Sequence, residues 1–415
     1  MIGWFSVRSF KKTTKSLKQI ADELGVAAIL SGTMEKHGGK VHIITELLDV
    51  NTNKRIWGDD FEYDSTDILS IQSKVSREII SALRVNLTSE EKRDIVKKYT
   101  DNPEAYKLYR KGIFFWNKNN GAYFDSAELY FKKALDIDPE YALAYAGLAS
   151  RYIFFKLPSQ LEGIPIARTY TEKALSLDSN LSEAITTLGF IQSDFDYDWS
   201  KSKITLEKAI RLSPNYSEAH LFYGNLLQYT GEDSQRGLQE VKKALELDPL
   251  STRLNWILGR NYFLARKYDL AEQQFKRTLN LYPDHLFTKG NLALLYLEQK
   301  RFPEAFDLIK QLPQNSHAGF IDQMSMLCYA DAASGDTAQA KPQLEKILRE
   351  YPSQNPLIVG YIYIALKNYN EALNMLELAY KTRDINLYWV KIDPPLDPIR
   401  NEPRFKAILA QMNLK

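Results

Sequence analysis

The sequence contains one cysteine, Cys328, in 415 residues. A disulfide framework within the chain is therefore excluded, and we interpret this thiol, which lies in the apolar run Met324–Tyr329, as buried filling rather than as a nucleophile. No apolar run reaches the ~18 residues that a membrane-spanning helix needs. The five histidines do not have the paired spacing of zinc ligands. We predict no metal, no cofactor and no membrane span.

The chain also lacks an excess of charge of either sign. Lysine and arginine total 54 against 52 aspartates and glutamates, which gives a formal net charge of +2. Binding to nucleic acid draws on a strong positive field, so we predict no nucleic-acid binding by this chain alone. Near the start, five basic residues form a local run that we interpret as a solvated face: Arg8, Lys11, Lys12, Lys15 and Lys18.

Catalytic motifs are missing as well. We find no glycine-rich phosphate loop, no kinase signature and no zinc-ligand spacing. The alternating carboxylates at Asp194, Asp196 and Asp198 resemble the start of a calcium loop. However, Trp199 stands where such a loop needs glycine, and Thr205 stands where it needs a bidentate glutamate. We interpret this stretch as a polar connector and predict that the chain is not an enzyme.

What the sequence does have is a repeated phrase. The stretch Leu258–Pro283 reads LGRNYFLARKYDLAEQQFKRTLNLYP, which matches the tail of the tetratricopeptide pattern, L-G-x2-Y…A-x3-F…P. Gly259 and Ala271 are small where two antiparallel helices must touch, and Pro283 lacks the N–H that a continuing helix needs. Such a hairpin cannot bury its apolar face alone, so it must stack on copies of itself.

The copies are present in register. The phrase at Ala134–Pro139 returns with variation at Ala174–Ser179, Ala209–Pro214, Ala244–Pro249 and Thr278–Pro283. From Ser179 to Pro283 the spacings are 35, 35 and 34 residues, the period of this repeat. We predict a mostly α fold, a tetratricopeptide-repeat α-solenoid of about seven helical hairpins over residues 96–385. A tail over residues 386–415 follows, with a capping helix at Asn401–Asn413.

The first 95 residues read differently from the repeats. Ser16–Leu24 has helical spacing, and Gly25 is suited to end that helix. Alternating apolar residues and a Gly-Gly turn predict three strands, and Ser65–Leu87 is predicted as a long amphipathic helix. The predicted strands are Ala27–Glu35, Val41–Leu48 and Arg55–Phe61. Residues 1–95 are therefore predicted to form a small α/β domain.

These residues also carry a resemblance to a known family. The stretch Ser16–Leu83, the following phrase at Leu87–Gly112 and the closing phrase DPPLDPIRNEPRFKAIL at Asp393–Leu409 are similar to proteins with a TolB-amino-terminal-like (FlgO-like) domain. The resemblance implies a regulatory part of a bacterial signalling system. It also implies a further strand and helix ahead of Trp4–Phe10, so the domain is expected to be truncated at its start and its sheet incomplete.

The repeat register predicts where a partner would bind. The first helix of each hairpin normally lines the concave face of such a superhelix, which is the usual binding surface. Aromatic side chains beside arginines and amides suit an extended peptide, because they supply stacking area and hydrogen-bond donors. The predicted partner-binding residues are Phe190, Asn225, Gln228, Arg253, Trp256, Arg260 and Phe263. In the alternative interpretation, Trp256 packs between helices and the two arginines are merely solvated.

The leading hypothesis is a cytoplasmic, non-enzymatic scaffold that binds a protein or peptide partner in the concave groove. A second hypothesis is the non-catalytic C-terminal portion of a nucleotide cyclase, protein kinase or winged-helix transcription regulator. A third is a cell-envelope structural protein, which would have a periplasmic location. No feature of the sequence specifies the partner's identity or the oligomeric state.

Overall fold

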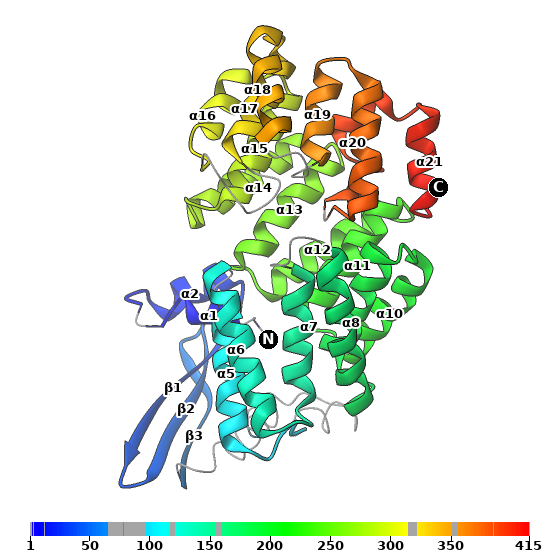
Figure 1. Cartoon of the computed structure of the whole chain (residues 1–415). Coiled ribbons are helices and arrows are strands. Elements are labelled where there is room, and N and C mark those ends of the chain that lie inside the picture. The colour runs from blue at the N-terminus through cyan, green and yellow to red at the C-terminus, as the bar shows by residue number, and fades with distance from the viewer. Residues whose placement is uncertain are drawn as a thin grey trace. The chain divides into compact units, whose positions relative to one another are not determined.

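The computed structural model describes most of the chain (Figure 1), namely residues 2, 4–11, 13–64, 78, 97–116, 121–154, 160–313, 322–350, 356–384 and 386–414. The chain divides into two compact units. The first contains residues 2–151 and 170–181, and the second contains residues 152–169 and 182–415. Each unit is described by itself below.

The first unit contains a three-stranded antiparallel sheet in the order β1-β2-β3. Its strands are β1 (Ala28–His37), β2 (Lys40–Asp49) and β3 (Lys54–Asp64). The register pairs Leu30 with Leu47 and Leu47 with Trp57, so one face is apolar, and Leu47 and Phe61 are buried on it. The three predicted strands are thus confirmed.

Two short helices precede the sheet in sequence, α1 (Trp4–Arg8) and α2 (Leu17–Leu24). Ser16 caps α2 by accepting a hydrogen bond from the Gln19 amide, and Gly25 ends it in a left-handed conformation with φ of 66°. This agrees with the helix and the stop that the sequence predicts. The predicted helix at Ser65–Leu87 lies outside the described residues, apart from Glu78.

The first unit also contains the first hairpin, α5 (Pro103–Trp116) with α6 (Gly121–Ile137), and most of α7 (Ala142–Phe154). The ring of Phe131 on α6 occupies the space that a side chain at Gly112 or Gly147 would need. The small residues therefore let helices approach a fully buried aromatic ring, as the repeat pattern predicts.

Helical hairpins continue as far as Thr382, and the predicted solenoid is confirmed. The described residues form eight hairpins, against about seven predicted. The first two are α5 with α6 and α7 with α8 (Gln160–Leu177). The other six are α9 (Ser182–Phe190) with α10 (Trp199–Leu212), α11 (Ser217–Thr230) with α12 (Ser234–Leu247), α13 (Thr252–Leu264) with α14 (Tyr268–Leu281), α15 (Leu286–Glu298) with α16 (Phe302–Ile309), α17 (Gln323–Ser334) with α18 (Thr337–Glu350), and α19 (Pro356–Ala365) with α20 (Tyr369–Thr382).

Glycines set the close contacts within the hairpins. A Cβ atom added to Gly224 would lie 2.5 Å from the carbonyl oxygen of Gly237, and one added to Gly237 would lie 2.6 Å from that of Gly224. At Gly259 an added Cβ would lie 2.5 Å from the ring of Phe275. In both hairpins the two helices can touch because glycine carries no side chain at the point of contact.

The turns between first and second helices use a left-handed residue. In α11–α12 this residue is Gly231, with φ of 73°, and in α13–α14 it is Arg266, with φ of 60°. An arginine in this conformation costs about 1–2 kcal/mol relative to the right-handed region. Arg266 therefore occupies a position for which glycine is the easier choice, and its side chain has a use described below.

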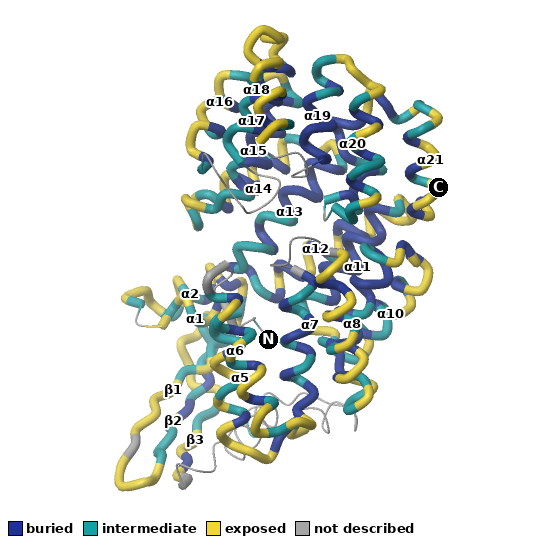
Figure 2. Tube along the Cα trace, in the orientation of Figure 1, coloured by how far each residue is buried: buried dark blue, intermediate teal, exposed yellow. Residues whose placement is uncertain are grey.

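From α7 onwards, the first helices are more deeply buried than the second helices. Figure 2 shows the C-terminal parts of α13 and α15 and most of α19 as buried, whereas α14 and α18 alternate between buried and exposed residues along their length. After α20 the chain forms two 3₁₀ turns, η2 (Leu387–Trp389) and η3 (Pro394–Ile399), and the helix α21 (Pro403–Gln411). We call residues 386–414 the closing segment, and α21 lies where the sequence predicts a capping helix.

Candidate functional site

All seven predicted partner-binding residues lie on first helices, but five of them are buried. Arg253 and Trp256 are half-buried, whereas the buried residues are Phe190, Asn225, Gln228, Arg260 and Phe263. Most of these seven positions are therefore covered in the structure. The reason is that neighbouring hairpins and the closing segment cover most of the first helices.

Four of the five buried residues contact their own repeat array. Phe190 packs against Phe222, with ring centroids 5.1 Å apart. Asn225 accepts a hydrogen bond from Asn261 of the next first helix at 3.1 Å. Gln228 packs against Gly237, and the ring of Phe263 packs against Tyr268. Their part in partner binding stays a prediction.

The fifth buried residue, Arg260, forms an ion pair with the closing segment. Its Nη2 donates to Asp393 Oδ1 at 2.9 Å, and both side chains are almost fully buried, at 2% and 0% exposure. Tyr361 of α19 donates its hydroxyl to the other oxygen of Asp393. The guanidinium carbon of Arg260 also lies 4.4 Å from the ring centre of Trp389. Two first helices thus hold one carboxylate of the closing segment.

A second ion pair extends this contact. Arg266, the left-handed turn residue, donates to both oxygens of Asp397 at 2.7 and 3.0 Å and to the carbonyl oxygen of Ile392 at 2.7 Å. Both bonds to the carboxylate come from Nη2, and Nη1 makes the bond to Ile392, so the two ends of the guanidinium hold two points of the closing segment. In the opposite direction, Lys391 of the closing segment donates to the carbonyl oxygen of Thr230 at 2.6 Å.

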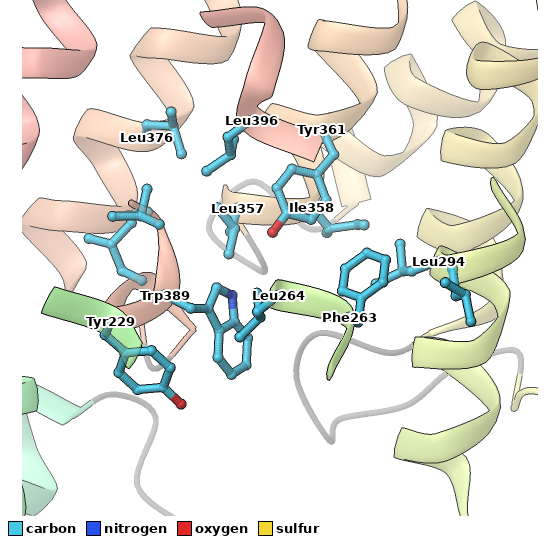
Figure 3. Packing of buried hydrophobic residues seen from close by; sticks show 14 of the residues in the cluster. Tyr229, Phe263, Leu264, Leu294, Leu357, Ile358, Tyr361, Leu376, Trp389 and Leu396 are labelled. Carbon is cyan, nitrogen blue, oxygen red and sulfur yellow. The ribbon is translucent and has the colours of Figure 1, made fainter. Parts of the chain in front are cut away.

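Apolar side chains complete the contact. Figure 3 shows Trp389 between Tyr229 and Leu264, and Leu396 on the side of Leu357 and Tyr361. The rings of Tyr229 and Tyr388 are 5.1 Å apart. The closing segment therefore meets first helices of several hairpins through both charged and apolar groups.

The end of the closing segment reaches the hairpin α9–α10. Trp199 donates its indole N–H to the carbonyl oxygen of Met412 at 2.7 Å, and Asn413 donates to that of Tyr197 at 3.1 Å. Arg383 is the C-cap residue of α20, and its guanidinium carbon lies 4.3 Å from the ring centre of Tyr197. These contacts join residues more than 180 positions apart in the chain.

Several polar atoms in this region have no partner among the described residues. They include Nε and Nη1 of Arg260 and the indole nitrogens of Trp256 and Trp389. Burial raises the pKa of Glu298 on α15 to about 7, and the carboxylates of Asp393 and Asp397 add to this effect. The site therefore holds like charges close together as well as opposite ones.

Arg253 and Trp256 form a half-buried group near the start of α13. Arg253 pairs with Glu218 of α11, and burial lowers its pKa to about 10. The ring of Trp256 lies 5.1 Å from that of Phe287 and 6.1 Å from that of His285 on the next hairpin. Arginine and aromatic groups from neighbouring repeats thus meet at one place.

The described residues contain no group of three or more His, Cys, Asp or Glu side chains placed to hold a metal. In the stretch that resembles a calcium loop, Asp194 accepts from Ser193, Asp196 pairs with Arg168, and Asp198 caps α10. The three carboxylates thus serve separate local contacts, as a polar connector would. No helix among the described parts of the chain is long and apolar enough to cross a membrane.

The sequence reasoning missed Asp393, Asp397 and Arg266. A signal was present, because the phrase DPPLDP contains two aspartates four residues apart, each followed by proline. We interpreted this phrase only as part of the resemblance to a known family. Its partners lie about 130 residues earlier in the chain, and no repeat pattern points to them.

Comparison with known proteins supports the repeat assignment. Sequence profiles described as "Tetratricopeptide repeat" match residues 224–285 and 357–384. A protein named putative adenylate cyclase 3 from Rhizobium meliloti (strain 1021) is 29% identical over 144 residues, which are 34% of this chain and 24% of that protein. Superkiller protein 3 from Schizosaccharomyces pombe (strain 972 / ATCC 24843) is 24% identical over 216 residues, 50% of this chain and 15% of that protein.

Two solved structures are similar to parts of this chain at low sequence identity. Yeast Tom70 is 17% identical with a TM-score of 0.43, covering 76% of this chain and 69% of the other. YrrB, described as a TPR protein with an unusual peptide-binding site, is 20% identical with a TM-score of 0.31, covering 51% and 95%. The chain spans about a quarter or less of the length of putative adenylate cyclase 3 and of superkiller protein 3.

Proposed function

We propose that this chain is a non-catalytic scaffold that binds a polypeptide partner on the first helices of its central hairpins. Tetratricopeptide repeats generally mediate protein–protein interaction. The observation that supports this site most directly is that Arg260 of α13, the turn residue Arg266 and Tyr361 of α19 already hold a polypeptide segment, the chain's own closing segment.

Within this proposal, Arg253 and Trp256 make the first contacts with the partner. Both are half-buried. Trp256 packs against Phe287 and His285 of the next hairpin, and Arg253 pairs with Glu218 of the preceding one. Trp256 also carries an indole N–H without an acceptor among the described residues. Arginine and tryptophan are the residue types that most often dominate binding energy at interfaces. Arg260 would join them where the closing segment is released, with Phe190, Asn225, Gln228 and Phe263 as their support.

The test is affinity capture from an extract of the source cells with the full chain. The variant Arg253→Ala/Trp256→Ala is expected to recover the partner at least ~10-fold less well than the wild type, because loss of an anchor residue typically costs about 2 kcal/mol or more. Ile204→Ala is the matched control, since Ile204 is an exposed apolar residue on the second helix α10. Equal recovery by all three proteins would contradict the proposal.

A second candidate function is the non-catalytic portion of a larger regulatory protein such as a nucleotide cyclase. The observation that favours it is the match to putative adenylate cyclase 3 over 34% of this chain. Reading the coding sequence upstream of Met1 tests it, and an in-frame catalytic domain is the expected result. The same reading decides between the cytoplasmic location that we propose and a periplasmic alternative, which a secretion signal would support.

We also propose that residues 1–95 are a TolB-amino-terminal-like domain of a bacterial signalling protein. Support comes from the three-stranded antiparallel sheet and from α2, which precedes it in sequence. Limited proteolysis of the full chain should cut first near residue 95, between this domain and the repeats. Cleavage confined to the repeats would contradict the proposed boundary.

A further inference from the structure

We infer that the closing segment is an exchangeable ligand held in cis. Its place on the first helices is then a binding site for a partner segment in which an aromatic residue precedes two carboxylates four residues apart. The inference rests on the proposed function in that it names the chemistry of the partner. It concerns the contacts around Arg260 and Arg266, not the group formed by Arg253 and Trp256.

The chemistry of the ligand can be taken from the segment that occupies the site. Trp389 stacks on Arg260, Asp393 binds Arg260 and Tyr361, and Asp397 binds Arg266. Pro394, Pro395 and Pro398 restrict the backbone between and beyond the two aspartates. A restricted segment loses little conformational freedom when it binds, so few contacts are enough to hold it.

The contact is also incomplete in a way that suits exchange. Arg260 uses one of its nitrogens for Asp393, whereas Nε and Nη1 find no acceptor among the described residues. The indole N–H of Trp389 is unpartnered in the same way. Buried polar groups in permanent contacts are normally satisfied. A partner that offers one more acceptor to Arg260 would therefore bind better than the chain's own segment.

A like charge lies beside the same contact. Glu298 is close enough to Asp393 and Asp397 for their charges to disfavour its ionisation. The site thus has two arginines that attract the segment and one glutamate that opposes it when ionised. Such a balance limits how tightly the segment is held, although its attachment to the chain keeps its effective concentration in the millimolar range.

The experiment uses a fluorescent peptide with the sequence of residues 386–400, NLYWVKIDPPLDPIR. Its binding is measured by anisotropy to the full wild-type chain and to the full-length variant Asp393→Ala/Asp397→Ala. The variant keeps both arginines but weakens its own segment, so it should bind the peptide at least ~10-fold more tightly than the wild type does. A peptide carrying Asp393→Asn and Asp397→Asn should bind the same variant at least ~10-fold more weakly.

Two further proteins serve as controls. Asp307→Ala removes a carboxylate that is 79% exposed on α16, and it should bind the peptide as the wild type does. Adding Arg266→Ala to the double variant should abolish the gain in binding. Both results are required if the gain comes from the vacated site rather than from a general loss of negative charge.

A charge exchange keeps the test valid if the double variant loses helicity. Arg266 and Asp397 are 35% and 50% exposed, so Arg266→Asp leaves no fully buried unpaired charge. This full-length variant should prefer a peptide with Asp397→Arg over the native peptide by at least ~10-fold. A helical double variant that does not bind the peptide, or an Arg266→Asp chain without this preference, would overturn the inference. Partner capture that still depended on Arg253 and Trp256 would leave the proposed function standing.

Discussion

The repeat hairpins and the closing segment are held in place by different kinds of contact. Within a hairpin such as α11–α12, Gly224 and Gly237 let two backbones touch, and the contact joins residues only 13 positions apart. The closing segment is held by Arg260–Asp393 and Arg266–Asp397, which join residues 133 and 131 positions apart. Hairpin packing is therefore local and apolar, whereas docking of the closing segment is long-range and depends on charge.

This difference has a consequence for which part of the molecule can change. A solenoid repeat draws its stability from its neighbours, and removing it exposes apolar surface on both sides. The closing segment lies on helices that are already stacked, so its release leaves the hairpins in contact. The strongest way to separate the two kinds of packing is to disrupt each one alone.

The largest effect is expected at the buried ion pair. Asp393→Leu leaves Arg260 buried without its counter-charge, which should cost about 3–5 kcal/mol. Amide hydrogen exchange of residues 387–399 should then become at least ~100-fold faster, while exchange in α11 and α12 stays unchanged. The triple variant Arg260→Met/Asp393→Leu/Tyr361→Phe removes all three polar groups and should recover most of the protection. Equal losses in α11 and α12 would show that the segment and the hairpins form one cooperative unit.

A smaller effect is expected within a hairpin. Gly224→Ala places a Cβ atom 2.5 Å from the carbonyl oxygen of Gly237, so the two helices must separate. Overpacking of this kind costs about 1–3 kcal/mol in urea unfolding. Gly360→Ala is the matched control, because the nearest atom there is 3.7 Å away and alanine favours helix by about 1 kcal/mol. If both variants were equally stable, the close approach at Gly224 would not be needed.

A pH-dependent effect is expected at Glu298. Its pKa is raised to about 7 in the folded chain, against 4.5 ordinarily, so the folded state favours the protonated carboxyl. The stability contribution is complete below pH 4.5 and is lost as the pH rises through about 7. Unfolding free energy should therefore fall by about 1–2 kcal/mol between pH 5 and pH 8 on account of this group. Glu298→Gln should remove that part of the fall, and an unchanged pH profile in the variant would contradict it.

The smallest effect is expected at His220, which makes a charged contact with Glu240 within the hairpin α11–α12. Burial lowers the pKa of His220, but hydrogen bonds with Glu240 at 2.6 Å and the Pro214 carbonyl at 2.9 Å outweigh it and raise the pKa overall. Both partners are acceptors, so the ring donates from both nitrogens. The stabilisation is complete below pH 6.5 and is lost as the pH rises through the folded pKa. In the wild type, the free energy of unfolding in urea should fall by about 0.5–1 kcal/mol above pH 6.5 because of this contact. The variant His220→Gln should lack that fall.

The same contrast explains what could be predicted from the sequence. The hairpins follow from local spacing, because small residues such as Gly259 and helix-ending residues such as Pro283 recur with the period of one repeat. The three strands follow from alternation and from a Gly-Gly turn. These features depend on residues that are close in sequence, so a single chain reveals them.

The site could be predicted only in part. The repeat register placed the seven residues on first helices, but it could not show that Asp393 covers Arg260. Nothing in a periodic pattern relates a residue to one 133 positions away, and each partner looks like an ordinary surface charge by itself. The contact of Arg266 could not be predicted either, because it depends on a left-handed backbone conformation that the neighbouring residues do not indicate.

The hydrogen bond from Trp199 to the carbonyl oxygen of Met412 spans 213 positions of the chain. During synthesis at about 5–20 residues per second, Met412 is made roughly 10–40 s after Trp199. The hairpins before it can fold as they leave the ribosome, since their contacts are local. Each first helix is complete but uncovered from its own synthesis until the closing segment follows, so a chaperone or a partner present at the ribosome can reach this surface before the chain's own end does.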